Sequence, residues 1–241
     1  MNLKKTMCLM LVAFGIIAFQ PVAHAVPTPM AIQLSDGINP IVLIADGDLN
    51  DANSADGVVS FIGSIGNWIV NVTTGLSYPA IGSTSIPQLD LSSVNVSSSL
   101  GGNLLIGLSV QNFIGPTNGF NFEAGGTTVG TVDFDSFLDS ANGLFGGNSM
   151  GTLFGGTGAF SDQALVMDEP LDFATPYSLT ITALINHGET ICDPPDSDNC
   201  VFVPVGGATS FDANLAAVPE PGSLILLGFG LIGLFGIGRK K

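Results

Sequence analysis

Lysine and arginine are missing from almost the whole chain. All five basic residues lie at its two ends: Lys4, Lys5, Arg239, Lys240 and Lys241. Against them stand 20 acidic residues, which give a formal net charge of −15. Nucleic-acid binding needs a basic patch that neutralises phosphates, and none can be built between Thr6 and Gly238. The sequence therefore excludes nucleic acid as a partner.

Residues 1–25 have the pattern of a secretory signal peptide. Lys4 and Lys5 precede an apolar run, and the small residues Ala23 and Ala25 follow it at the distance expected of a cleavage site. We expect the secretion machinery to export the chain and the mature protein to begin at Val26.

The C-terminal end, residues 218–241, combines three features in a fixed order. Val218-Pro219-Glu220-Pro221 comes first, an uncharged Gly-rich stretch at 223–238 follows, and Arg239, Lys240 and Lys241 close the chain. At about 1.5 Å per residue, a helix over 223–238 would measure about 24 Å, short of a hydrocarbon core of roughly 30 Å. We expect a short transmembrane helix that holds the protein at the membrane temporarily.

This tail resembles the PEP-CTERM sorting domain, also called the ice-binding protein C-terminal domain. Pro219, Glu220 and Pro221 match the recognition motif, and the terminal basic cluster matches the retention signal. The resemblance implies recognition by an exosortase, processing near the motif and transfer to the cell surface. It covers about a tenth of the chain and implies nothing about ice.

The body, residues 26–217, reads as one all-β domain. Apolar residues alternate with polar ones over 177–185, 104–110, 68–72 and 209–215, which is the pattern of half-buried strands. Further strand candidates lie at 40–45, 58–62, 89–97, 128–134, 162–167 and 201–204. We predict a single antiparallel β-sandwich, jelly-roll-like in topology. A weak helix is expected at 136–144, and the Gly-rich stretch 141–158 is expected to form an ordered loop with Phe145 and Phe154 packed inward.

Cysteine and histidine are scarce in the body. Cys192 and Cys200 are its only cysteines, and a pair in an exported chain predicts a disulfide. Closing this nine-residue loop would stabilise the fold by about 2–3 kcal/mol. His187 is the only histidine after residue 25, so no zinc site is expected, and we predict that it lies at the surface at a strand end.

One acidic segment suggests a calcium site. Its candidate ligands are Asp46, Asp48, Asn50, Asp51 and Asp56. Oxygen ligands at alternating positions suit this cation. The match to a calcium-binding loop is partial, because Asp51 occupies a position that usually holds glycine and Gly57 one that usually holds glutamate. The alternative is a solvated Asp/Asn turn.

A hydrolase is the remotest possibility. Ser149 lies in a G-x-S-x-G pattern, and Asp168 and His187 follow in the chain order of a catalytic triad. The strand–turn–helix context that such a serine needs is missing. We therefore expect a non-enzymatic surface or matrix protein with a structural role, associated with extracellular polysaccharide. The alternative is a calcium-dependent glycan-binding module or adhesin.

Overall fold

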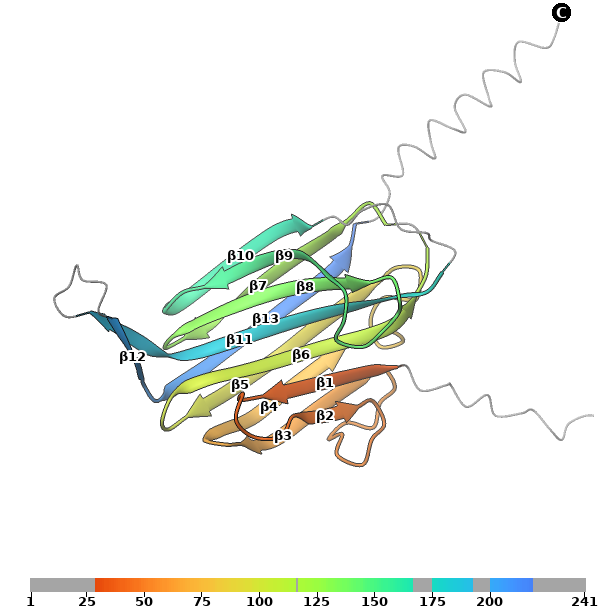
Figure 1. The fold of residues 1–241 in the computed structure, drawn as a ribbon. Helices are drawn as coiled ribbons and strands as arrows, with labels where there is room; N and C mark the ends of the chain where they lie inside the picture. Colours follow the sequence, from red (N-terminus) through yellow and green to blue (C-terminus); the bar gives the residue numbers. More distant parts are fainter. Residues whose placement is uncertain (1–28, 116, 167–174, 193–199, 219–241) are drawn as a thin grey trace, which may run out of the picture.

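A computed structural model describes residues 29–115, 117–166, 175–192 and 200–218, which form two antiparallel sheets (Figure 1). The seven-stranded sheet contains β1 (Met30–Ser35), β2 (Val42–Ala45), β6 (Gly102–Phe113), β8 (Thr131–Asp139), β9 (Asn148–Gly155), β11 (Tyr177–Cys192) and β12 (Cys200–Pro204). The six-stranded sheet contains β3 (Val58–Ile65), β4 (Trp68–Leu76), β5 (Gln88–Ser98), β7 (Phe120–Thr128), β10 (Gly158–Val166) and β13 (Gly207–Ala217).

The strand order is not the sequence order in either sheet. The seven-stranded sheet runs β2-β1-β6-β11-β8-β9. In addition, β12 pairs with the C-terminal end of β11, over Gly188–Cys192. The six-stranded sheet runs β10-β7-β13-β5-β4-β3. The prediction of an all-β antiparallel architecture is confirmed, and the sheets form the layers of a sandwich. The finer jelly-roll description stays a prediction.

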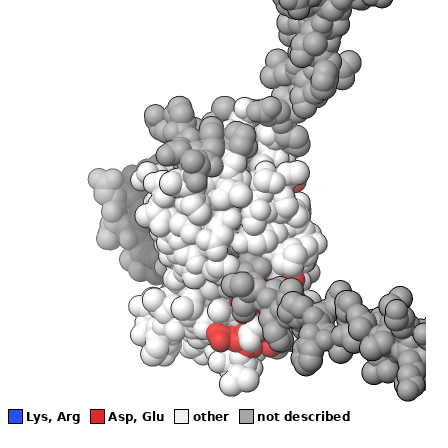
Figure 2. Space-filling view, turned by 90° about the vertical axis from the view of Figure 1, so that its right-hand side faces the viewer, with Lys and Arg blue, Asp and Glu red and all other residues white. Residues whose placement is uncertain are grey.

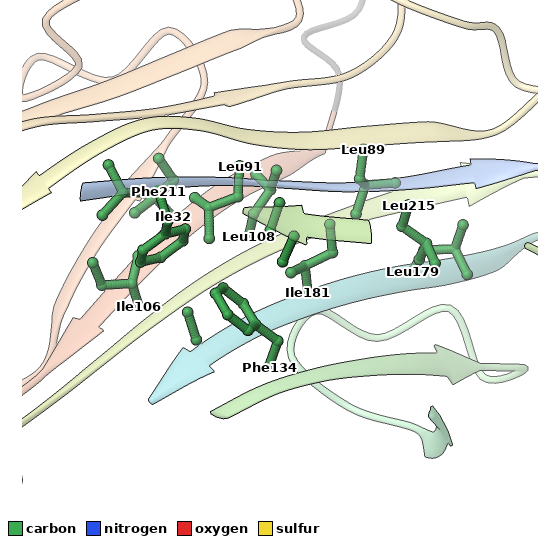
Figure 3. Packing of buried hydrophobic residues seen from close by; sticks show 14 of the residues in the cluster. Ile32, Leu89, Leu91, Ile106, Leu108, Phe134, Leu179, Ile181, Phe211 and Leu215 are labelled. Atoms are coloured by element: carbon green, nitrogen blue, oxygen red, sulfur yellow. The ribbon is translucent and has the colours of Figure 1, made fainter. Parts of the chain in front are cut away.

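The core lies between the two sheets. Successive side chains on a strand point to opposite faces, so each sheet turns every second residue inward. Leu89 and Leu215 from the six-stranded sheet, and Ile106 and Ile181 from the other, are all 0% exposed. Figure 3 shows these side chains among those that meet between the sheets. Because residues 29–218 contain no Lys or Arg, apolar burial and backbone hydrogen bonds hold the described body together.

One connection folds back over the outer face of the seven-stranded sheet. The Phe145 amide donates to Ser109 Oγ (3.0 Å), and the Ser178 hydroxyl donates to the Gly143 carbonyl. The Phe145 ring lies over Gly107, where an added Cβ would come within 3.3 Å of it. This cover explains why Ser178 and its neighbour Thr180 are buried although they point away from the core.

Several sequence predictions were wrong in detail. The helix expected at 136–144 is replaced by the end of β8 and a turn, because Phe134, Ser136 and Leu138 alternate into the buried face. The loop expected at 141–158 contains β9, on which Phe154 is 55% exposed rather than packed inward. Strands β1, β7 and β9 were not predicted.

The predicted terminal segments lie outside the described residues. These are the signal peptide at 1–25, with Ala23 and Ala25, and the tail from Pro219 onward, with the helix at 223–238. Within the described part of the chain, no helix is long and apolar enough to cross a bilayer. The last described residue, Val218, donates its amide to the Gly119 carbonyl (2.9 Å), so the described backbone reaches the first residue of the sorting motif.

Candidate functional site

The Asp46–Asp56 segment is a loop held together by its own carboxylates. Asp46 accepts a hydrogen bond from the Gly57 amide (2.8 Å), and Asp51 accepts one from the Ser60 amide (2.9 Å). Asp48 accepts a third, from the Ala45 amide (3.1 Å). Three of the acidic side chains therefore accept hydrogen bonds from backbone amides. This arrangement is the one that the solvated Asp/Asn turn alternative describes.

The Asp46 carboxyl is partly buried in this loop. Burial raises the pKa of Asp46, and repulsion from Asp51 and Asp56 raises it further. The side chain of Asn50 is exposed. The described residues nevertheless contain no group of three or more His, Cys, Asp or Glu side chains placed to hold a metal ion. Calcium binding here stays a prediction that the geometry does not strengthen.

The backbone places Cys192 and Cys200 opposite each other. They are register partners at the end of the β11–β12 ladder. Directly opposed residues on antiparallel strands have Cα atoms about 4.5–5.5 Å apart, within the range that a disulfide spans. The disulfide remains a prediction, now with a register that permits it.

The residues of the serine-hydrolase pattern do not converge. Ser149 on β9 is in register with Phe137, which in turn pairs with Thr180 on β11. His187 lies seven residues further along β11, which at roughly 3.3 Å per residue is about 23 Å away. Asp168 lies outside the described residues. This separation overturns the serine-hydrolase alternative.

His187 also corrects a prediction, because it is 0% exposed rather than a surface residue. Its Nε2 shares a hydrogen bond with Thr209 Oγ1 (2.7 Å), and its ring packs on Trp68 at 4.6 Å between centroids. Burial lowers the pKa of His187. It is a core residue at the end of the sandwich, with no substrate-accessible surface.

An open hollow lies elsewhere, on the outer face of the six-stranded sheet. It measures about 480 Å³ and spans β5, β13, β7 and β10. We call it the acidic hollow and define it by its outward side chains and its glycine: Gln88, Asp90, Glu123, Gly125, Ser161, Gln163, Asp212 and Asn214.

Strand register assembles the acidic hollow from segments far apart in the sequence. One row of paired residues crosses all four strands: Asp90, Asn214, Glu123 and Gln163. The next row contains Asp212, Gly125 and Ser161. Because Gly125 has no side chain, the floor between Asp212 and Ser161 stays open.

Carboxylates dominate the charge of the hollow. Burial raises the pKa of Asp90 to about 6, and repulsion from Asp212 adds to this shift. Asp212 is anchored by the Ser93 amide, which donates to its Oδ1 (2.6 Å) at a bulge between β5 and β13. Among the described residues that line the hollow, none is aromatic and none is basic. Figure 2 shows one end of the molecule, where the described surface carries acidic atoms and no Lys or Arg.

The chemistry that these groups offer is hydrogen bonding to a polar ligand. Amides at Gln88, Gln163 and Asn214 both donate and accept, carboxylates accept, and Ser161 does either. Sequence reasoning missed this site. Alternation along each strand marks the outward polar positions, but which strands become neighbours depends on a non-sequential strand order.

Comparisons with known proteins give little about the body. No curated protein matches the chain. Solved structures give faint likenesses: the enzymatically active domain of bacteriophage CBA120 tailspike protein 4 (TM-score 0.31, 11% identity), the module TmCBM61 in complex with beta-1,4-galactotriose (0.31, 9%), and the family 11 carbohydrate-binding module from Clostridium thermocellum in complex with a beta-1,3-1,4-mixed-linked tetrasaccharide (0.30, 12%).

The matched parts differ greatly in extent. They cover 65%, 66% and 79% of this chain, and 20%, 92% and 98% of the three structures in the same order. The chain thus spans only a fifth of the tailspike domain's length. TM-scores near 0.3 carry no argument about ligand or activity, so the site must be argued from its own residues.

The tail gives a definite result. Residues 217–240 match the model of the PEP-CTERM protein-sorting motif. Of the predicted sorting residues, the structure describes Val218. The others lie outside the described residues: Pro219, Glu220, Pro221, Arg239, Lys240 and Lys241. The chain therefore carries a PEP-CTERM protein-sorting motif, which implies export and sorting by an exosortase.

Proposed function

We propose that this exported protein is a non-enzymatic component of the extracellular polysaccharide layer. It has a structural role there and binds a neutral glycan in the acidic hollow. The observation that carries the proposal is the hollow itself, an open site of about 480 Å³ lined by amide, carboxylate and hydroxyl groups. The sorting motif at 217–240 supports the location.

The charge of the hollow decides the class of glycan. Asp90, Glu123 and Asp212 would repel uronate or sulfate groups, and residues 29–218 hold no Lys or Arg to compensate. Neutral sugars carry many hydroxyls that donate to carboxylates and exchange hydrogen bonds with side-chain amides. A neutral polysaccharide is therefore the ligand that the site fits best.

The absence of catalysis is part of the proposal. Glycoside hydrolysis uses two carboxyl groups on opposite sides of the scissile bond, one as acid and one as base or nucleophile. Asp90 has the raised pKa of an acid, but Asp212 is held by the Ser93 amide and the Ser92 hydroxyl (3.5 Å) at the sheet surface. The hollow lies open on a sheet face, and nothing on its described walls encloses a bond between the two groups.

Co-sedimentation tests the function. The exported protein is mixed with the neutral fraction of the host's extracellular polysaccharide, with calcium or with a chelator. The double substitution Glu123→Ala and Gln163→Ala removes two exposed groups of the hollow. Ile69→Ala, exposed on β4 of the same sheet face and outside the hollow, is the matched control.

We expect the wild type and the control to pellet with the polysaccharide in both ion conditions, and much less of the double variant to pellet. The recovered polysaccharide should keep its chain length. Pelleting of the double variant at the wild-type level would contradict the proposal. Pelleting only with calcium would contradict it too, and would instead direct attention to the Asp46–Asp56 loop. Shortened polysaccharide would contradict the non-enzymatic role.

A further inference from the structure

The outer face of the seven-stranded sheet carries two parallel rows of unlike chemistry. The polar row pairs Gln33, Gly107, Thr182, Asp135 and Thr152 across β1, β6, β11, β8 and β9. The neighbouring row, two residues along each strand, is largely apolar and pairs Ser35, Leu105, Leu184, Asp133 and Phe154. We call these two rows together the mixed groove.

The mixed groove is hollowed as well as patterned. One hollow of about 180 Å³ includes Gln33, Thr182 and the ring of Phe145, and a second of about 370 Å³ includes Asp135 and Phe154. They adjoin where Thr182 pairs with Asp135. Five strands at about 4.8 Å spacing make the groove about 19 Å long, and the rows lie about 7 Å apart.

Apolar side chains stand open on this face. Phe154 is 55% exposed and Leu184 is 38% exposed. Phe145 has a φ of +56°, in the left-handed region that bulky residues rarely adopt, and its ring lies over Gly107. The backbone is thus held in a costly conformation that places a ring over Gly107, within the polar row.

This combination fits the two sides of a sugar chain. Pyranose rings present C–H groups on their faces, which pack on phenyl rings, and hydroxyls at their edges, which bond to Asp135, Thr182 or Gln33. Asp133 and Asp135 lie on the same face and would repel an anionic polymer, since the described residues offer no base. The occupant with this chemistry is again a neutral glycan.

Resting on the proposed function, we propose that the mixed groove is a second glycan-binding surface and that one molecule bridges two polysaccharide chains. The two sheets pack through their inner faces, so the acidic hollow and the mixed groove face opposite directions about one sandwich thickness apart. Two sites on opposite faces bind separate chains, and bridging raises avidity without any new contact. This gives the structural role a physical basis, namely cross-linking.

Light scattering and pelleting together test the inference. Protein exported by the host is added in increasing amounts to the soluble neutral fraction of its extracellular polysaccharide. Four proteins are compared: the wild type, the hollow variant Glu123→Ala/Gln163→Ala, the groove variant Phe154→Ala, and all three substitutions combined. Ile69→Ala serves as the control, and far-ultraviolet circular dichroism confirms that each variant is folded.

We expect the wild type and Ile69→Ala to increase the scattering particle size at least several-fold, with a maximum at an intermediate ratio of protein to polysaccharide. Each single-face variant should still bind but no longer enlarge the particles, and the combined variant should do neither. Phe154→Ala that cross-links as well as wild type overturns the second site while leaving the proposed function intact. A hollow variant that binds and cross-links like wild type overturns the proposed function instead. Self-association of wild type without polysaccharide, abolished by Phe154→Ala, would assign the groove to a second copy of the chain and overturn the inference.

Discussion

The two outer faces of this sandwich are built by the same alternation but differ in chemistry. On the six-stranded sheet, the row from Asp90 to Gln163 is polar on all four strands. On the seven-stranded sheet, a polar row lies beside one that ends in Leu184, Asp133 and Phe154. The first face offers hydrogen-bonding groups, whereas the second also offers apolar side chains. The comparison teaches that a strand pattern fixes which residues point outward, while register decides what they form together.

The largest expected effect is a loss of stability at a position outside both faces. It tests whether stability and glycan binding can be changed separately. Reducing the predicted Cys192–Cys200 disulfide should lower the free energy of unfolding by about 2–3 kcal/mol. Glycan binding should stay unchanged, because β12 pairs with β11 only over Gly188–Cys192, beyond both binding rows. Denaturant unfolding and co-sedimentation with and without reductant measure the two quantities. Cys192→Ser, which leaves one free thiol, should be as unstable as the reduced protein and insensitive to reductant.

The next effect breaks the polar face. Glu123→Ala with Gln163→Ala should weaken glycan binding about 30-fold, which corresponds to roughly 2 kcal/mol for two hydrogen bonds. Titration calorimetry with the neutral polysaccharide measures the change. Both side chains are exposed, so the unfolding transition should not move. A binding loss matched by an equal loss of stability would mean that the variant acts through the fold.

The third prediction concerns how the charge of Asp90 on the polar face affects stability. Asp90 on the polar face has a pKa raised from 3.8 to about 6 by burial and by Asp212. Between pH 3.8 and 6 the folded protein keeps a proton that the unfolded chain has lost. Ionisation of Asp90 therefore destabilises the fold as pH rises through this window, and the penalty is complete above it.

Asp90→Asn should remove that penalty. We expect it to raise the free energy of unfolding by about 1–2 kcal/mol at pH 7.5, a figure that allows for solvent screening of a partly exposed group, and by nothing below pH 3.8. Urea unfolding at several pH values measures this. Asp135→Asn on the other face is the matched variant, because burial also raises the pKa of Asp135. If Asp90→Asn raised the free energy of unfolding equally at every pH, the gain could not come from the raised pKa of Asp90.

The smallest effect concerns the ring on the mixed face. Phe145→Ala should cost about 1 kcal/mol, because the packing of a partly exposed ring over Gly107 is lost while the Cβ that strains the left-handed φ remains. Phe145→Gly should cost less than Phe145→Ala, since glycine adopts that φ freely. Thermal unfolding of the two variants checks the order. The reverse order would show that the backbone here is not strained.

Much of the fold followed from the sequence. The alternation at 177–185 and 104–110 predicted the central strands β11 and β6, whose inward residues are completely buried. Failures came where tertiary contacts override local pattern. The buried alternation of β8 was mistaken for a helix beginning at Ser136, and the glycines around Phe154 hid strand β9. His187, placed by its polarity at the surface, is buried because Thr209 supplies its hydrogen bond and Trp68 its packing.

The sites could be predicted less well. The sorting tail was identified because its motif is contiguous, and the match at 217–240 confirms it. The acidic hollow is the opposite case: Asp90 and Gln163 are far apart in the chain and come together only because β5, β13, β7 and β10 are neighbours. The contiguous Asp46–Asp56 cluster attracted attention, yet its carboxylates cap backbone amides. Contiguity made both of these segments visible in the sequence, and calcium binding at the second stays a prediction.

The measurement that tests the central claim most directly is titration of the exported protein with the neutral polysaccharide fraction, followed by sizing of the recovered polysaccharide. The account predicts saturable binding that Glu123→Ala/Gln163→Ala weakens and Ile69→Ala does not, with the polysaccharide recovered at its original length. Binding that is indifferent to Glu123 and Gln163, or a polysaccharide that comes back shortened, would contradict a non-catalytic glycan site in the acidic hollow.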